Sequence, residues 1–224
     1  MPKRLPQHRL AVVLLLLAAA LTACGSEDSS SSAAGTGECQ YADGDSSTPA
    51  TKPPSTPTAT GKVSATLHLS AGDVPLTLDA DVAPCTVNSF LSLAEQGYFD
   101  DTPCHRLTTT GIFILQCGDP TGTGRGGPGY SFADELGGAM ALPASGSVVN
   151  YRAGTLAMAN AGANTNGSQF FLVYDDSPLA PDYSVFGTLS AEGLEVVRSV
   201  AAKGTAADDV SPAEAVTITS VETP

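Results

Sequence analysis

Apolar and polar residues alternate along several short segments of the chain. The clearest is KVSATLHL at residues 62–69, where apolar residues such as Val63, Leu67 and Leu69 occupy every second position. A period of two predicts a strand with one buried face. Further short apolar runs predict strands at residues 74–80, 104–108, 112–117, 154–159, 169–174, 184–189 and 215–221.

Two segments follow the helical period instead. Pro84 suits the first turn of a helix, Phe90 and Ala94 fall at helical spacing after it, and Gly97 suits the helix end. A second short helix is predicted at residues 192–201. Many strands, glycine-rich turns and two helices predict a mainly β fold, a closed antiparallel barrel with helices over its ends.

The first residues are predicted to be a targeting segment rather than part of the fold. Basic residues precede the apolar run at 10–21, which is too short for a comfortable membrane span and is typical of a secretory signal peptide. The run leads into Leu-Thr-Ala-Cys, which resembles a bacterial lipobox. We therefore expect a signal peptide at 1–23, a lipid on Cys24 and an extracytoplasmic protein anchored to the cell membrane. The alternative is an ordinary signal peptide followed by a chance cysteine.

Residues 24–60 are rich in Ser, Thr, Pro and Gly and contain almost no apolar side chains. Such a segment cannot bury enough surface to fold alone, so it is predicted to be a disordered tether. Its exception is Cys39-Gln40-Tyr41, which could dock. The globular domain is expected at 61–224.

The net charge of the chain indicates which classes of partner are disfavoured. Seven Lys and Arg residues and 23 Asp and Glu residues follow the signal segment, which gives a net charge of −16. An acidic surface disfavours nucleic acid, because phosphates require Lys and Arg. It also disfavours anionic lipid, so membrane attachment is expected to come only from the lipid chains on Cys24.

Four cysteines remain after Cys24, an even number in a chain predicted to be exported. An oxidising compartment favours up to two disulfides among them, and the sequence leaves all three connectivities open. The four are Cys39, Cys85, Cys104 and Cys117.

Three other kinds of site are disfavoured. The stretch from Gly122 to Gly127 matches G-x-G-x-x-G, but no helix opens after it to hold a phosphate. Cys104, His105 and Cys117 lack the paired spacing of a zinc site. The chain also has no G-x-S-x-G nucleophile elbow. We expect neither a metal nor a cofactor.

Two segments resemble the cyclophilin family of peptidyl-prolyl cis–trans isomerases: HRLTTTGIFILQCGD at 105–119 and MANAGANTNGSQFF at 158–171. The resemblance extends over residues 61–224. It implies an eight-stranded antiparallel barrel capped by two helices, with the site on its outside and no cofactor. It also implies catalysis of X-Pro bond rotation in proline-containing segments, and the predicted export of the chain makes exported proteins the expected substrates. A monomer is expected.

By the same resemblance, Arg106 is the catalytic arginine, and Gln116 orients it. Substrate contacts are implied for a further set, in which the apolar members hold the proline ring and the polar members hold the peptide backbone. This set is Phe113, Ile114, Ala159, Asn160, Gln169, Phe171, Leu179 and Tyr183.

The sequence departs from the family pattern in several places. Ile114 stands where the family often has methionine, and Pro178 precedes Leu179 where many eukaryotic members have a tryptophan that helps hold cyclosporin, so weak cyclosporin inhibition is expected. Tyr183 stands where many members have histidine. Two extra residues around Thr108-Thr109-Thr110 lie between Arg106 and Gln116, so the alignment of Ile112 to Ile114 with the pocket stays open. The alternative function is a module that holds proline-containing peptides without turnover, as a chaperone or adhesin. A third candidate function is that of a structural lipoprotein that is stabilised by disulfides and binds no ligand.

Overall fold

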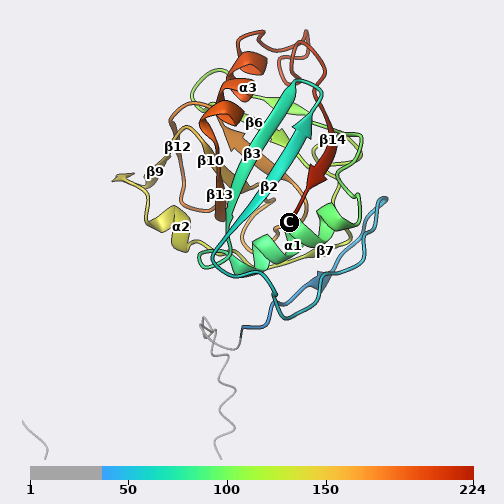
Figure 1. Ribbon diagram of the computed structural model, residues 1–224. Helices are drawn as coiled ribbons and strands as arrows, with labels where there is room; N and C mark the ends of the chain where they lie inside the picture. Colours follow the sequence, from blue (N-terminus) through green and yellow to red (C-terminus); the bar gives the residue numbers. More distant parts are fainter. Residues whose placement is uncertain (1–36) are drawn as a thin grey trace, which may run out of the picture. The chain divides into compact units, whose positions relative to one another are not determined.

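The computed structural model describes residues 37–224. The alternating segment forms β2 (Lys62–Leu69), which pairs along its whole length with β3 (Gly72–Asp79) in an antiparallel hairpin. These two strands belong to a large antiparallel sheet (Figure 1). Its order is β4 (Thr102–Pro103), β14 (Thr217–Glu222), β2, β3, β13 (Val185–Leu189), β10 (Thr155–Met158), β11 (Phe170–Val173), β6 (Ile114–Cys117) and β5 (Arg106–Leu107).

The predicted closed eight-stranded barrel is not confirmed. The sheet has nine strands in a linear order, and within residues 37–224 its end strands β4 and β5 are not paired with each other. It curls into a half-barrel around the core. Two smaller sheets accompany it: β12 (Ser177–Leu179), β9 (Val148–Tyr151) and β8 (Ala144–Ser145) form one, and β1 (Ala42–Asp43) and β7 (Tyr130–Ser131) form the other.

Both predicted helices are present. They are α1 (Pro84–Glu95) and α3 (Ala191–Ala201), which lie at opposite ends of the β2–β3 hairpin (Figure 1). Pro84 opens α1, and the Ser190 side chain caps α3 by accepting a hydrogen bond from the Gly193 N–H. A short third helix, α2 (Gly137–Met140), has no counterpart in the sequence prediction.

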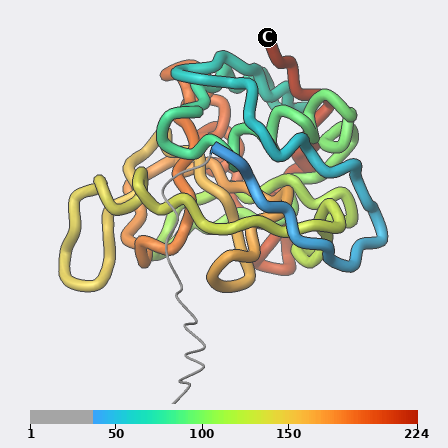
Figure 2. The backbone as a smooth tube through the Cα atoms, turned by 90° about the horizontal axis from the view of Figure 1, so that it is seen from below, coloured from blue at the N-terminus to red at the C-terminus, as the bar shows by residue number. Residues whose placement is uncertain are grey.

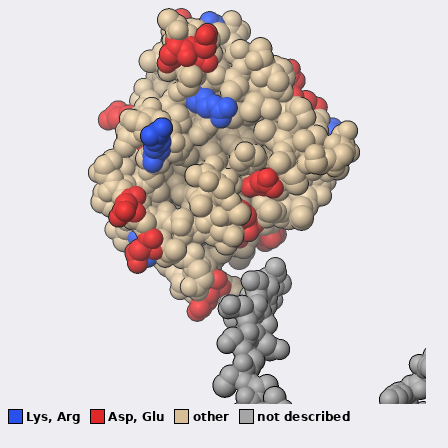
Figure 3. All heavy atoms as spheres, turned by 180° about the vertical axis from the view of Figure 1, so that it is seen from behind, with Lys and Arg blue, Asp and Glu red and all other residues tan. Residues whose placement is uncertain are grey.

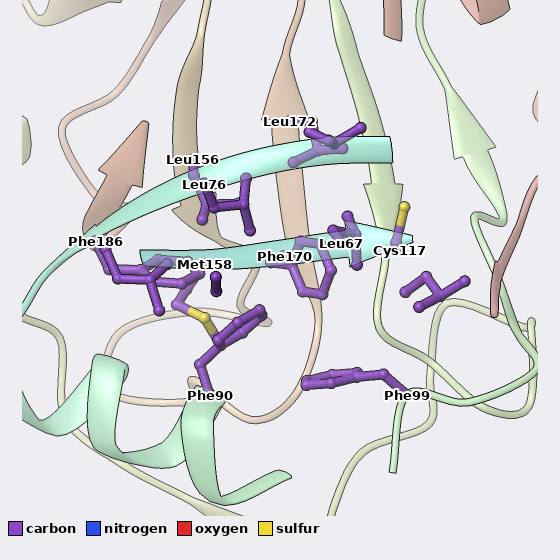
Figure 4. Close-up of a cluster of buried hydrophobic side chains, with 14 of the residues drawn as sticks. Leu67, Leu76, Phe90, Phe99, Cys117, Leu156, Met158, Phe170, Leu172 and Phe186 are labelled. Carbon is purple, nitrogen blue, oxygen red and sulfur yellow. The ribbon is translucent and has the colours of Figure 1, made fainter. Parts of the chain in front are cut away.

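Strand alternation divides the apolar residues of β6, β10 and β11 between two clusters. The inner core contains Leu156 and Phe170 together with Phe90, whose side chain projects from α1 toward the strands in Figure 4. The outer cluster lies on the opposite face of the same strands and contains Ala157 and Phe171. Because successive side chains of a strand point to opposite faces, the adjacent phenylalanines serve different clusters.

Residues 38–60, which we call the strap, pack against the domain. Cys39 is buried and joined to Cys85 by a disulfide, and Tyr41 packs edge-on against Tyr130 and Phe132. The predicted disordered tether therefore does not extend over this segment. The disulfide and the aromatic contacts supply the stabilisation that the composition of the strap lacks.

The cysteine pairing is Cys39–Cys85 and Cys104–Cys117, one of the three connectivities that the sequence left open. The second bridge joins the chain just before β5 to the end of β6. Cys24 and the predicted signal peptide lie outside the described residues. No helix within residues 37–224 is long and apolar enough to cross a membrane.

Candidate active site

A line of polar side chains crosses three neighbouring strands. Arg106 of β5 stands directly opposite Gln116 of β6, and Gln116 stands opposite Phe171 of β11, so all three side chains share the outer face of the sheet. The Arg106 Nη1 donates to Gln116 Oε1 at 3.2 Å, and Gln116 Nε2 donates to Gln169 Oε1 at 2.8 Å. Gln169 Nε2 in turn donates to the Gly126 carbonyl at 2.9 Å. Each amide fixes the orientation of the next, and the last bond anchors the line to the backbone.

An apolar surface lies beside this line. Phe171 and Ile114 are buried in the outer cluster, and Leu179 and Tyr183 pack against it while remaining partly exposed. The Tyr183 ring stands edge-on to Phe171, with the ring centroids 5.4 Å apart. Rings in this arrangement form an apolar wall on the face of the sheet that also carries Arg106.

Phe113 is the one predicted site residue that the structure does not bring into this group. It packs against the inner core, with its ring 5.9 Å from that of Tyr174, and its N–H donates to Ser177 Oγ at 2.8 Å. Ile112, the residue before Phe113, packs against the outer cluster instead. Alternation places Ile112 and Ile114 together and sends Phe113 to the other side.

Ala159 and Asn160 follow β10 and border the polar line. The Ala159 N–H donates to the Gln169 carbonyl at 2.9 Å. The Asn160 side chain donates to the Asp182 carbonyl at 2.9 Å and accepts from the Gly162 N–H at 3.2 Å. The Asn160 side chain therefore holds two loops in place, which agrees with a role for its backbone, rather than its amide, toward a peptide.

Sequence reasoning missed Tyr151, which is buried beneath the apolar surface. Its hydroxyl donates to the Ala180 carbonyl at 3.2 Å and accepts from the Tyr183 N–H at 3.3 Å. These bonds fix the loop that carries Tyr183. Tyr151 lies on β9, and its neighbouring residues gave no signal that this strand would reach the site.

The glycine-rich loop at 122–127 is organised by the buried carboxylate of Asp119. Its oxygens accept from the backbone and hydroxyl of Thr121 and from the Gly126 N–H. Burial by itself raises the pKa of this carboxyl, but these hydrogen bonds outweigh it and hold the pKa below its ordinary value. The bonded carboxylate thus fixes Gly126, the backbone end of the polar line.

A pocket of about 420 Å³ opens next to the polar line. Gln116, Gln169 and Asn160 line it on the side of the strands, and the loop at 124–131 lines it on another side. Strap residues Gly44 and Asp45 complete the lining, a contribution that the sequence analysis did not foresee.

His105 lies beside Arg106, and neither of its buried ring nitrogens has a hydrogen-bond partner within residues 37–224. Burial lowers the pKa of His105 below its ordinary value of 6.5, because the charged imidazolium is poorly solvated there. The other histidine of the domain behaves oppositely. A hydrogen bond from His68 to Asp73 raises the pKa of His68, which lies on β2.

The two histidines make opposite contributions to the pH dependence of stability. His105 has a lowered folded pKa, so its contribution is present above pH 6.5 and is lost as the pH falls below 6.5. His68 has a raised folded pKa, so its contribution is present below pH 6.5 and is lost as the pH rises through the folded pKa. We expect that acidification from pH 7.5 to pH 5 destabilises His105→Gln less, and His68→Gln more, than the wild type. Urea denaturation of the three proteins at both pH values measures this, and equal shifts in all three would contradict it.

The surface around these elements is not strongly basic. Figure 3 shows isolated Lys and Arg groups separated by wide uncharged areas on one face of the described residues. Within residues 37–224, no group of three or more His, Cys, Asp or Glu side chains could hold a metal ion.

Comparisons with known proteins agree with this geometry. The sequence model of the family described as "Cyclophilin type peptidyl-prolyl cis-trans isomerase/CLD" matches residues 64–223. Among curated relatives, the "Probable peptidyl-prolyl cis-trans isomerase B" of Mycobacterium tuberculosis is 49% identical over 193 residues. That match covers 82% of this chain and 63% of the relative, so the chain spans less than two thirds of the relative's length. "Peptidyl-prolyl cis-trans isomerase A" of the same organism is 37% identical over 174 residues, which cover 70% of this chain and 90% of the relative.

Solved structures give the same assignment. A cyclophilin type peptidyl-prolyl cis–trans isomerase of Cryptosporidium parvum is 30% identical, with a TM-score of 0.61 over 73% of this chain and 98% of that one. A second structure of that protein, determined in the presence of the dipeptide Ala-Pro, is 31% identical with a TM-score of 0.60, over 72% of this chain and 98% of that one. The chain belongs to the cyclophilin-type peptidyl-prolyl cis–trans isomerase family.

Proposed function

We propose that the domain accelerates cis–trans rotation about X-Pro peptide bonds. The observation that carries this proposal is the alignment of Arg106, Gln116 and Gln169 along one edge of the apolar surface formed around Phe171. A proline ring needs an apolar wall, and the amide beside it needs a fixed donor. The two lie next to each other here because facing residues of β5, β6 and β11 share one face of the sheet.

The chemistry required is modest. An X-Pro bond prefers trans by only about 0.5–1 kcal/mol, but rotation crosses a barrier of about 20 kcal/mol because the amide loses its resonance. The catalyst must therefore bind the twisted amide more tightly than either planar form. No bond breaks, and no cofactor is required.

In this mechanism, each group has one task. Arg106 donates a hydrogen bond to the prolyl nitrogen, whose lone pair becomes available as the amide twists. Guanidinium suits this task because it stays charged and presents its donors in a rigid fork. Gln116 holds that fork, and Gln169 holds Gln116. Ile114, Phe171, Leu179 and Tyr183 receive the ring, and the backbone at Ala159 and Asn160 receives the residue before proline.

An isomerase assay tests the proposal. The full chain and a short Ala-Pro-containing peptide are combined, and exchange between cis and trans signals is followed by NMR. We expect exchange to become faster in proportion to the concentration of protein. Binding of the peptide without faster exchange would contradict the proposal and favour a module that only holds proline-containing segments.

We also propose that the protein acts outside the cytoplasm on exported proteins, as a monomer held at the membrane by a lipid on Cys24. The Leu-Thr-Ala-Cys sequence and the two disulfides, which are typical of oxidising compartments, support this location. Mass spectrometry of the protein purified from its own membrane should find a chain that begins at a diacylglycerol-modified Cys24. A chain that begins elsewhere and carries no lipid would contradict the proposal.

A further inference from the structure

The strap supplies part of the pocket beside the polar line. Gly44 and Asp45 border the same space of about 420 Å³ that Gln116, Gln169 and Asn160 border. The side chains that would act on the X-Pro bond therefore share one cavity with a segment from well before β2 in the sequence. Figure 2 shows the strap in blue, running outward along the domain and turning back.

The strap is held firmly enough to act as a wall. Where the strap runs outward, the Gly44 N–H donates to the Gly129 carbonyl at 2.9 Å. Where it turns back, the Ala50 N–H donates to the Pro128 carbonyl at 2.9 Å. Between them, the Ser46 hydroxyl donates to the Gly127 carbonyl. Three consecutive carbonyls of the pocket loop are thus bonded to the strap, and the Cys39–Cys85 disulfide secures its beginning.

Two charged residues line this pocket, Asp45 on the strap and Arg125 on the loop. Both side chains are exposed, and neither takes part in an ion pair within residues 37–224. The net charge of the rest of the chain determines whether the pocket favours a cationic or an anionic peptide side chain. An excess of acidic residues creates a field that favours a cationic side chain in the pocket, and Asp45 reinforces that field locally.

The position of the pocket identifies the part of the peptide that reaches it. Under the proposed function, the apolar surface receives proline, and the backbone at Ala159 and Asn160 receives the residue before it. The pocket begins at Ala159 and Asn160 and extends past Ala161 to the strap. Side chains of an extended peptide alternate in direction, so the side chain of the second residue before proline can enter the pocket.

We propose that the strap is a specificity element, and that Asp45 selects peptides with Lys or Arg at the second position before proline. This inference rests on the proposed isomerase function and assigns to that site the class of substrate it prefers. Arg125 acts against the selection and limits its size. For an exposed carboxylate, the expected preference is about twofold to fivefold in kcat/KM.

The test compares three tetrapeptides, Lys-Ala-Pro-Phe, Ala-Ala-Pro-Phe and Glu-Ala-Pro-Phe, with the full chain at low ionic strength. The measured quantity is the ratio of kcat/KM for the Lys peptide to that for the Ala peptide. We expect this ratio to fall about twofold to fivefold in Asp45→Asn. In Asp45→Lys, we expect the Glu peptide to become preferred over the Lys peptide. Arg125→Gln should raise the ratio.

Glu38→Gln is the matched control, because it removes one carboxylate from the same strap but outside the pocket. We expect its ratio to equal that of the wild type. Equal ratios in the wild type, Asp45→Asn and Asp45→Lys would overturn the inference while leaving the isomerase function intact. Absence of turnover with all three peptides would instead overturn the proposed function itself.

A second variant tests the strap as a unit. Cys39→Ser/Cys85→Ser removes the covalent link that holds its beginning. We expect the double variant to lose the preference for the Lys peptide, as Asp45→Asn does. If the circular dichroism of the variant matches that of the wild type and the preference for the Lys peptide is unchanged, the disulfide-linked strap has no role in that preference. If the double variant does not fold, the Asp45 variants decide the question alone.

Discussion

Arg106→Ala is expected to lower kcat/KM for X-Pro isomerisation by about 10²–10³-fold, the range measured when one preorganised donor is removed from a catalytic site. The physical reason is that Arg106 supplies the donor to the prolyl nitrogen, and its neighbours Gln116 and Gln169 can only orient it. Arg106 is exposed, so the free energy of unfolding should change by less than about 0.5 kcal/mol. NMR exchange measurements of the isomerisation rate, together with urea denaturation, separate the two effects.

Two further variants sharpen this prediction. Arg106→Lys keeps the positive charge but loses the planar fork that matches Gln116, so it should recover only a small part of the activity. Arg152→Ala removes an exposed arginine that lies outside the site, and it should behave as the wild type. If Arg106→Ala kept more than half of the wild-type kcat/KM, the assignment of Arg106 as the catalytic donor would be wrong.

Gly118→Ala is expected to lower the free energy of unfolding by about 3–4 kcal/mol, through the combined costs of a left-handed backbone and of overpacking. Gly118 follows β6 with a φ of +88°. A Cβ at this position would collide with the Ser168 carbonyl oxygen and press on the ring of Phe170. The chain can relieve this collision only by separating the segment after β6 from the segment that leads into β11. Isomerase activity should fall as well, because Gln116 and Gln169 lie on these two segments.

Gly111→Ala is the matched control for this substitution. Gly111 has a φ of +75°, but a Cβ there would meet no atom within 4 Å. It should therefore show only the backbone cost, about 1–2 kcal/mol. Urea denaturation of both variants measures the difference. Equal losses of stability would mean that the close approach of Gly118 to Ser168 does not constrain the fold.

Local periodicity was enough to predict the hairpin and the two longer helices. The alternation at 62–69 and the helical spacing after Pro84 both reflect burial of one face against a single core, and the structure confirms both. The order of the strands in the sheet was beyond such reasoning, because pairing of β14 with β2, or of β6 with β11, depends on contacts between distant parts of the chain. The curled but open sheet is likewise a property of the whole molecule.

The site residues also divide into those that the sequence could predict and those that it could not. The family resemblance was enough to single out Arg106, Gln116 and Gln169, and the structure brings all three together. It could not place Phe113, because the two extra residues after Arg106 leave open which side chain of the following strand faces outward. Composition predicted disorder for residues 24–60 apart from Cys39-Gln40-Tyr41, since composition counts apolar content and cannot count a disulfide or hydrogen bonds to a distant loop.

The Cys39–Cys85 bridge also changes how the domain would carry mechanical load. A pulling force applied to the chain before Cys39 passes through the disulfide directly to Cys85, at the start of α1. Residues 40–84, which include the strap and the β2–β3 hairpin, lie inside the covalent loop, so this force cannot draw them out while the disulfide is intact. In the oxidised protein, stretching from the N-terminal side would therefore leave the strap in place, whereas after reduction the same force would peel the strap away first.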